Sequence, residues 1–136
     1  MTIRQLDEKT LVSGQLAPAE IAALADRGIT VLVNNRPDFE EPGQPLAADI
    51  EAAAEAAGIA YRFVPIIRGI GPADVECMQQ AMHEAGDGKL LAFCRSGTRS
   101  ALACALAQRE DGAAAEDVER KLAEAGFDSG PISHLL

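Results

Sequence analysis

The residues best suited to chemistry in this chain of 136 residues lie in one short stretch, residues 90–100, which reads LLAFCRSGTRS. An apolar run ends at Cys94, a turn with Gly97 follows, and a segment rich in Ala and Leu begins after Ser100. This order predicts a strand, a tight loop and a helix. The loop amides and the positive end of the helix dipole then converge on the thiol. Such a setting favours a thiolate and also holds an oxyanion.

The side chains of this loop suggest separate roles. Cys94 is the candidate nucleophile, and Arg99 offers a planar fork suited to two oxygens of a phosphate or a sulfur oxyanion. Gly97 permits a backbone angle that turns the amides inward. Ser100 is expected to donate a hydrogen bond to Cys94 and help it leave a covalent intermediate. The remaining residues of the loop are expected to shape its rim and contact substrate: Arg95, Ser96 and Thr98.

A structural explanation exists for the same stretch: a buried cysteine at a strand end, followed by an ordinary helix. The glycine, two arginines and several hydroxyl side chains within six residues of Cys94 favour the chemical interpretation.

The elements that must position this loop follow from the apolar periodicity. Strands are expected at residues 3–6, 10–12, 29–33, 60–65 and 89–93, and helices at 18–28, 46–57, 75–85, 101–107 and 114–125. The alternation predicts an α/β fold, a single domain over residues 1–136 with a mainly parallel sheet flanked by helices. The helix at 101–107 is apolar on every side and should be buried centrally.

Sites in open α/β sheets form outside the carboxyl ends of the strands, so segments 34–38, 66–69 and 94–100 should gather at one edge. Asp38 is the best candidate for a general acid in these segments, although a turn after Pro37 explains it equally well. Arg36 is a candidate second contact for the anion, or else a solvated side chain. The segment 65–72 contains no acid, and Asp74 beyond it is explained by helix capping.

The composition of the chain limits the kinds of binding partner that can be expected. The formal net charge of −9 argues against a binder of nucleic acid or of anionic membranes. The N-terminal ten residues lack the apolar core of a signal peptide, and no apolar run is long enough to span a bilayer, so a cytoplasmic protein is expected. Three cysteines without C-x-x-C spacing do not suggest a disulfide scaffold or a zinc site. The expected partner is a small anionic substrate, without metal or cofactor; no protein partner is indicated.

Four stretches carry a resemblance to a known family: LVSGQL, GITVLVNNRPDFEEPGQP, YRFVPI and FCRSGTRSALACALAQ. These stretches resemble the phosphatase-like domain of β-lactamase-hydrolase-like proteins, and the resemblance covers nearly the whole chain. The resemblance implies the fold of dual-specificity protein phosphatases, whose phosphate loop reads C-x-x-G-x-x-R-[ST]. Cys94, Gly97, Arg99 and Ser100 match this loop by type. One residue is missing between Gly97 and Arg99, and Phe93 stands where phosphatases carry a His.

The loop is equally similar to the shorter active loop of rhodanese-type sulfurtransferases, in which Cys94 would carry a persulfide. Three functions therefore stay open. The first is a cysteine-dependent phosphatase-like hydrolase with a covalent Cys94 intermediate, acting on a phosphate ester. The second is a sulfurtransferase that takes sulfur from a sulfane donor. The third is a non-catalytic module that binds an anion or a partner.

Overall fold

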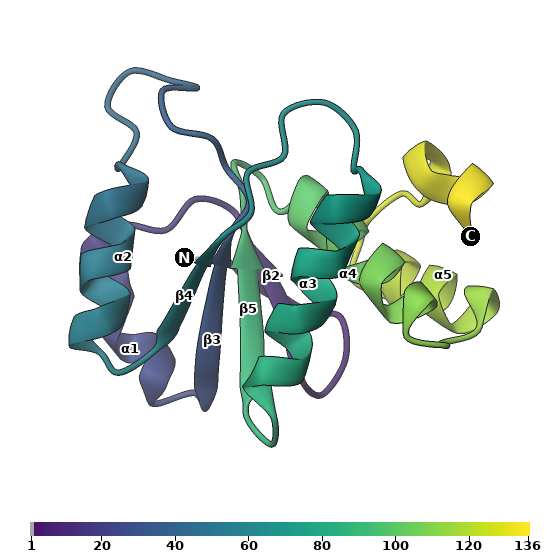
Figure 1. Cartoon of the computed structure of the whole chain (residues 1–136), viewed down its shortest axis with the longest axis horizontal. Helices are drawn as coiled ribbons and strands as arrows, with labels where there is room; N and C mark the ends of the chain where they lie inside the picture. The colour runs from purple at the N-terminus through teal and green to yellow at the C-terminus, as the bar shows by residue number, and fades with distance from the viewer. Residues whose placement is uncertain (1) are drawn as a thin grey trace.

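One sheet organises the computed structural model, which describes residues 2–136 (Figure 1). Its strand order is β1-β2-β5-β3-β4. The first two strands pair antiparallel, and every other pair in the sheet is parallel, which confirms the predicted mainly parallel sheet. The strands are β1 (Ile3–Gln5), β2 (Thr10–Ser13), β3 (Ile29–Asn34), β4 (Ala60–Phe63) and β5 (Lys89–Phe93).

Helices cover both faces of the sheet. In Figure 1, α1 and α2 lie on one side, and α3, α4 and α5 lie on the other. Their bounds are α1 (Ala22–Ala25), α2 (Ala47–Ala56), α3 (Pro72–Ala85), α4 (Thr98–Glu110) and α5 (Ala115–Glu124), with 3₁₀ turns η1 (Pro18–Glu20) and η2 (Gly130–Leu135). None of the helices in this part of the chain is long and apolar enough to cross a bilayer.

Three helices differ from the expected bounds by three residues or more, and one of them is α3, which begins at Pro72 rather than at residue 75. The segment expected as one helix at 18–28 divides into η1 and α1 because Pro18 opens a 3₁₀ turn, closed by the Glu20 carboxylate accepting from the Ala17 amide at 2.8 Å. The helix expected at 101 begins at Thr98, directly after Gly97. Because the loop is short, Arg99 and Ser100 belong to the first turn of α4 rather than to the loop.

The core is divided by the sheet. One part packs α3, α4 and α5 on the sheet and includes Met78, Leu90 and Leu122. The other packs α1 and α2 on the opposite face and includes Ile50 and Leu91. All side chains of α4 from Ser100 to Ala107 are buried, so the helix is central, as its all-round apolar sequence predicts.

The parallel strands end at one edge, where the loops after β3, β4 and β5 are joined by backbone hydrogen bonds. The Asn35 amide donates to the Phe93 carbonyl at 2.8 Å, and the Ile66 amide donates to the Asn35 carbonyl at 2.9 Å. On the other side, the Cys94 amide donates to the Ser13 carbonyl at 3.3 Å. The predicted gathering of the strand ends is thereby confirmed.

Candidate active site

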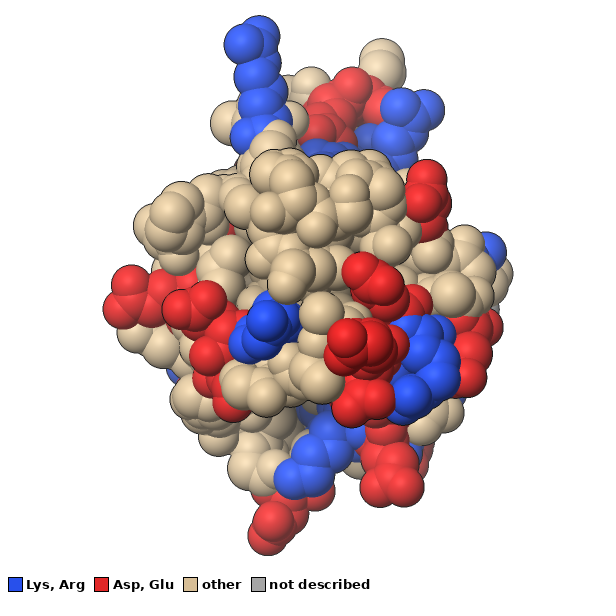
Figure 2. Space-filling view, turned by 90° about the vertical axis from the view of Figure 1, so that its right-hand side faces the viewer, with Lys and Arg blue, Asp and Glu red and all other residues tan. Residues whose placement is uncertain are grey.

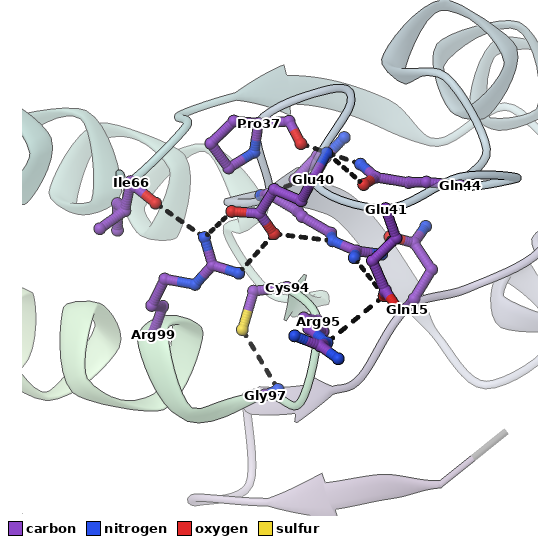
Figure 3. Close-up of polar contacts among 12 residues, drawn as sticks. Gln15, Pro37, Glu40, Glu41, Gln44, Ile66, Cys94, Arg95, Gly97 and Arg99 are labelled. Carbon is purple, nitrogen blue, oxygen red and sulfur yellow. Dashed lines mark hydrogen bonds and ion pairs between the residues drawn. The ribbon is translucent and has the colours of Figure 1, made fainter. Parts of the chain in front are cut away.

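Cys94 follows β5 directly, and its sulfur is enclosed by the loop (Figure 3). The residue is 1% exposed, and the Gly97 amide donates to Sγ at 3.1 Å. Gly97 has φ +94°, and a Cβ at this position would lie 3.3 Å from the carbonyl carbon and oxygen of Ser13. Glycine therefore serves both the backbone angle and the close approach to β2, as its place in the motif predicts.

The turn after β2 packs against the backbone of the Cys94 loop. The Gln15 amide donates to the Arg95 carbonyl at 3.3 Å. A Cβ at Gly14 would lie 3.0 Å from the same carbonyl oxygen, so the two backbones are in tight contact. The Cys94 loop thus rests on a second loop that is about eighty residues earlier in the chain.

Arg99 is held by acceptors from two other loops. Its Nη1 donates to Glu40 Oε2 at 2.7 Å and to the Ile66 carbonyl at 2.8 Å, and its Nη2 donates to Glu40 Oε1 at 2.8 Å. The hydrogen bond with Glu40 raises the pKa of Arg99 against the effect of burial, and attraction to the Cys94 sulfur adds to this shift. Arg99 is therefore a fixed positive charge beside the thiol.

The carboxylate of Glu40 is stabilised in its charged form. Hydrogen bonds from Arg99, and with smaller effect from Arg36, lower the pKa of Glu40 to about 2, although partial burial opposes the shift. No role is predicted for Glu40 from the sequence, yet its carboxylate accepts two hydrogen bonds from Arg99.

Arg36 is buried behind the two glutamates of the β3–α2 loop, with its side chain 3% exposed. Its Nε donates to Glu40 Oε1 at 2.9 Å, its Nη2 to Glu41 Oε1 at 2.5 Å, and its Nη1 to Gln15 Oε1 at 3.0 Å. Glu41 also lies 3.3 Å from Arg95 Nε. Glu40 therefore bridges Arg36 to Arg99 in the first turn of α4, and Glu41 bridges Arg36 to Arg95 in the Cys94 loop.

Asp38 points to a different partner. Its Oδ1 accepts from the Ala47 amide at 2.8 Å, at the start of α2, where the N-cap residue Leu46 has no capping side chain. Between Asp38 and Glu40 lies Phe39, which has φ +66° and is 84% exposed. This turn separates two nearby carboxylates: one caps α2 and the other contacts Arg99.

The predicted hydrogen bond from Ser100 to Cys94 is wrong. The Ser100 hydroxyl donates instead to Asn35 Oδ1 at 2.8 Å. Asn35 is fully buried, and its Nδ2 donates to the Val64 carbonyl at 2.9 Å. Because α4 starts at Thr98, Ser100 lies inside its first turn and faces the end of β3 rather than the thiol.

The rim contains the other predicted residues. Arg95, Ser96 and Thr98 are exposed, and the Ser96 hydroxyl donates to the Thr98 hydroxyl at 3.3 Å. A groove of about 360 Å³ begins beside Arg99 and has mostly apolar walls, which include Ile70, Leu102, Ile132 and Leu135. Figure 2 shows the face that carries α5 and η2, with uncharged side chains over much of its upper part and mixed charges below.

The loop, the sheet and the central helix define the class: the fold is that of the cysteine-based protein phosphatases. The chain belongs to the family described as beta-lactamase hydrolase-like protein, phosphatase-like domain, whose model matches residues 2–111. It is 40% identical over 132 residues to a beta-lactamase hydrolase-like protein of Xylella fastidiosa (strain Temecula1 / ATCC 700964). That match covers 96% of this chain, which spans about 30% of the relative's length.

Solved structures agree with this assignment. A candidate phosphatase from Neisseria meningitidis z2491 is 32% identical and superposes with a TM-score of 0.80, covering 99% of this chain and 96% of that one. The P. aeruginosa protein TpbA, crystallised in complex with pTyr, is similar in fold, with a TM-score of 0.65 at 16% identity. That match covers 95% of this chain and 76% of TpbA. The resemblance read from the sequence is confirmed for both family and fold.

Proposed function

We propose that this chain is a cysteine-dependent phosphatase-like hydrolase that uses Cys94 as its nucleophile. The observation that carries the proposal is the placement of two groups around the sulfur: the Gly97 amide, which donates to it at 3.1 Å, and the guanidinium of Arg99, which lies beside it in Figure 3. Family membership and the Neisseria neighbour support phosphatase-like chemistry at this loop. The substrate would be a small phosphate ester.

The proposed reaction has two displacements. The Cys94 thiolate attacks phosphorus, an S–P bond forms, and the P–O bond to the leaving group breaks. Water then attacks phosphorus, the S–P bond breaks, and inorganic phosphate and the thiolate are released. Loop amides and Arg99 stabilise the charge on the phosphoryl oxygens in both steps. The leaving oxygen takes its proton from solvent unless Asp38 leaves the end of α2, so we expect slow turnover.

A sulfurtransferase is the second candidate, and two observations favour it. The loop from Cys94 to Arg99 is one residue shorter than the phosphatase pattern, and Ser100 donates to Asn35 instead of assisting the thiol. In this reaction the Cys94 thiolate attacks the outer sulfur of thiosulfate, an S–S bond forms, and sulfite leaves. An acceptor such as cyanide then attacks the outer sulfur, which gives thiocyanate and restores the thiolate.

Parallel assays separate the candidates. The protein is offered p-nitrophenyl phosphate in one assay, and thiosulfate with cyanide in the other, with Cys94→Ser as the matched control in both. We expect slow p-nitrophenol release that disappears in Cys94→Ser, because a hydroxyl is a far weaker nucleophile than a thiolate.

The outcomes are distinct. Thiocyanate formation with phosphate release at background makes the chain a sulfurtransferase. Background rates in both assays over several donors and esters leave the loop as an anion- or partner-binding module. Activity that survives in Cys94→Ser contradicts both enzymatic candidates.

A further inference from the structure

The groove beside Arg99 differs in its chemistry from the larger cavities of the chain. Its volume of about 360 Å³ lies within the range of small-molecule sites, about 300–1,000 Å³. Although the chain has 21 acidic residues, none of the described residues that line this groove is Asp or Glu. Two larger cavities both include carboxylates: Asp7 and Glu8 in one, Glu76 and Glu110 in the other. An apolar group can therefore enter this groove without removing water from a carboxylate.

The groove begins at the proposed anion site. Arg99 is one of its lining residues, and Arg99 Nη1 donates at 2.8 Å to the carbonyl of Ile66, which also lines it. In Figure 3, Arg99 lies between Ile66 and the Cys94 sulfur. One ligand can therefore place an anionic group at Cys94 and an apolar group in the groove.

Two segments that are far apart in the chain form the walls. One is the loop between β4 and α3, which includes Ile67, and the other is η2, which includes Ile132 and Leu135. Ile132 is buried in the core, and the Leu136 carbonyl accepts from Arg109 Nε at 3.3 Å, so η2 is anchored on both sides of Leu135. The groove is therefore formed before a ligand binds.

The mouth of the groove exposes apolar side chains that the core does not use. Ile67 is 77% exposed and Leu135 is 51% exposed, whereas Leu102 between the walls is only 6% exposed. Apolar side chains that are exposed together beside a polar rim are typical of binding grooves. The family model matches residues 2–111 and does not extend to η2, so family membership alone does not assign a ligand to this groove.

The apolar stretch is limited in length. A neighbouring cavity of about 540 Å³ shares Ile70 and Leu135 with the groove and adds the charged side chains of Arg109 and Glu110. With a rise of 1.5 Å per residue, Arg109 lies about 15 Å from Arg99 along the axis of α4. A medium-length alkyl group fits this stretch, whereas a longer one would meet the charged groups.

We propose that the groove between Ile67 and Leu135 binds the organic group of the substrate, and that the substrate is a phosphate monoester of a medium-length aliphatic alcohol. The inference rests on the proposed function, because it places the phosphoryl group at Cys94. Ile67 and Leu135 then determine specificity through the apolar area that they offer, and they take no part in the chemistry.

The experiment compares three phosphate monoesters: methyl phosphate, hexyl phosphate and glucose 6-phosphate, whose six carbons carry oxygen. Titration calorimetry in the Cys94→Ser background measures affinity without covalent chemistry. A fully buried methylene contributes about fourfold in affinity, so even partial burial should make hexyl phosphate bind at least about tenfold more tightly than methyl phosphate. Glucose 6-phosphate should bind within about threefold of methyl phosphate, because its hydroxyl groups lose water in the groove.

A double variant tests where the alkyl group lies. Ile67→Ser with Leu135→Ser removes apolar area from both walls, so the ratio of hexyl to methyl phosphate affinity should fall below about threefold. Phe63→Ser is the matched control, because Phe63 is also an exposed apolar residue but does not line the groove, and the ratio should stay at its parent value. Thermal unfolding identifies a variant that fails to fold, and Ile67→Ser alone then carries the comparison.

Three results overturn the proposal. One is a parent protein that binds none of the esters, and another is a parent ratio below about twofold. The third is a ratio that survives in a folded groove variant. Sedimentation of the parent tests a different occupant: a dimer that Leu135→Ser dissociates, together with a ratio near one, would assign the groove to a second copy of the chain.

Failure of this proposal and failure of the proposed function have different signatures. A hydrolase that releases phosphate from methyl and hexyl phosphate with equal kcat/KM loses the groove proposal alone. A protein without turnover, but with the expected order of affinities, keeps the groove as a binding site for an alkyl phosphate and loses the hydrolase.

Discussion

Glu40 and Arg99 are 59 residues apart in the chain and are joined by two parallel hydrogen bonds, Oε2 to Nη1 at 2.7 Å and Oε1 to Nη2 at 2.8 Å. This two-point geometry is the strong form of an arginine–carboxylate contact. It connects the β3–α2 loop to the first turn of α4 across the carboxyl edge of the sheet. The orientation of Arg99 beside the thiol therefore depends on a loop that the Cys94 motif does not contain.

The first prediction concerns acid stability. The pKa of Glu40 falls from its ordinary value of 4.5 to about 2 on folding, so the folded state binds fewer protons between these values. Stability from Glu40 is therefore fully present above about pH 4.5 and is lost as pH falls toward 2. Because the side chain is partly exposed, we expect about 1–3 kcal/mol. Urea unfolding of the parent and Glu40→Gln from pH 2.5 to 6 measures it; parallel curves would contradict it.

The second prediction concerns the reactivity of the three cysteines. Cys94 should react with iodoacetamide first at mildly acidic pH, because the Gly97 amide and Arg99 lie beside its sulfur. Cys77 is exposed, and we expect it to react more slowly than Cys94. Cys104 should stay unlabelled until the protein unfolds, since complete burial raises the pKa of its thiol. Peptide mass spectrometry against pH follows all three sites, and equal rates at Cys94 and Cys77 would remove the support for a nucleophile.

The third prediction concerns the planar guanidinium group of Arg99, as distinct from its positive charge alone. Lys at this position keeps the charge but cannot present two edges, one to Glu40 and one to an anion. Loss of a charged hydrogen bond costs about 1.5–3 kcal/mol, so Arg99→Lys should weaken phosphate binding by about ten- to a hundredfold. Calorimetry on both proteins is the measurement. An affinity within twofold of the parent would move the anion site away from Arg99.

The fourth prediction separates two roles of Asp38. Asn caps helices as well as Asp, so Asp38→Asn should preserve stability, whereas Asp38→Ala should lose about 0.5–2 kcal/mol at the start of α2. With its carboxylate at the Ala47 amide, we expect Asp38→Asn to change turnover less than twofold. Turnover and urea unfolding of both variants test this. A drop of more than tenfold in a stable Asp38→Asn protein would identify Asp38 as the general acid.

The fifth prediction concerns Asn35, which joins three strand ends and α4. Its side chain donates to the Val64 carbonyl and accepts from the Ser100 hydroxyl, and all of these groups are shielded from water. Asn35→Ala leaves buried polar groups without partners, so we expect a loss of about 2–4 kcal/mol. Chemical denaturation measures it, and Ser100→Ala is the matched single-contact control. A loss below 1 kcal/mol would mean that the site does not depend on this junction.

The sequence predicts the Cys94 loop well because its information is local: apolar strand, cysteine, glycine and helix follow within a dozen residues. Glu40 and Asn35 could not be found in the same way. Their partners lie tens of residues away in the chain, and many other acidic residues occur in similar sequence contexts. The prediction of Asp38 depends on the position of its segment at the sheet edge, and segment position does not show which side of a turn a carboxylate faces.

One local signal was present and points to Asp38. The α2 segment starts with Pro45-Leu46-Ala47, without Ser, Thr, Asp or Asn at its N-cap, so its first amides need an acceptor from elsewhere. Ser100 was misplaced for a related reason. The pattern that marks the loop does not show where the helix begins, and a start three residues earlier moves the hydroxyl from the thiol to Asn35.

The strand order has a consequence for how the chain folds during its synthesis. β5 lies between β2 and β3, yet it is the last of the five strands to leave the ribosome. Until it arrives, β2 and β3 share no neighbour, and the sheet cannot close by pairing strands that are adjacent in sequence. Such non-local pairing belongs to the slower class of folding reactions. Cys94 emerges together with the strand that completes the sheet, so its sulfur stays open to oxidants until that final insertion has enclosed it.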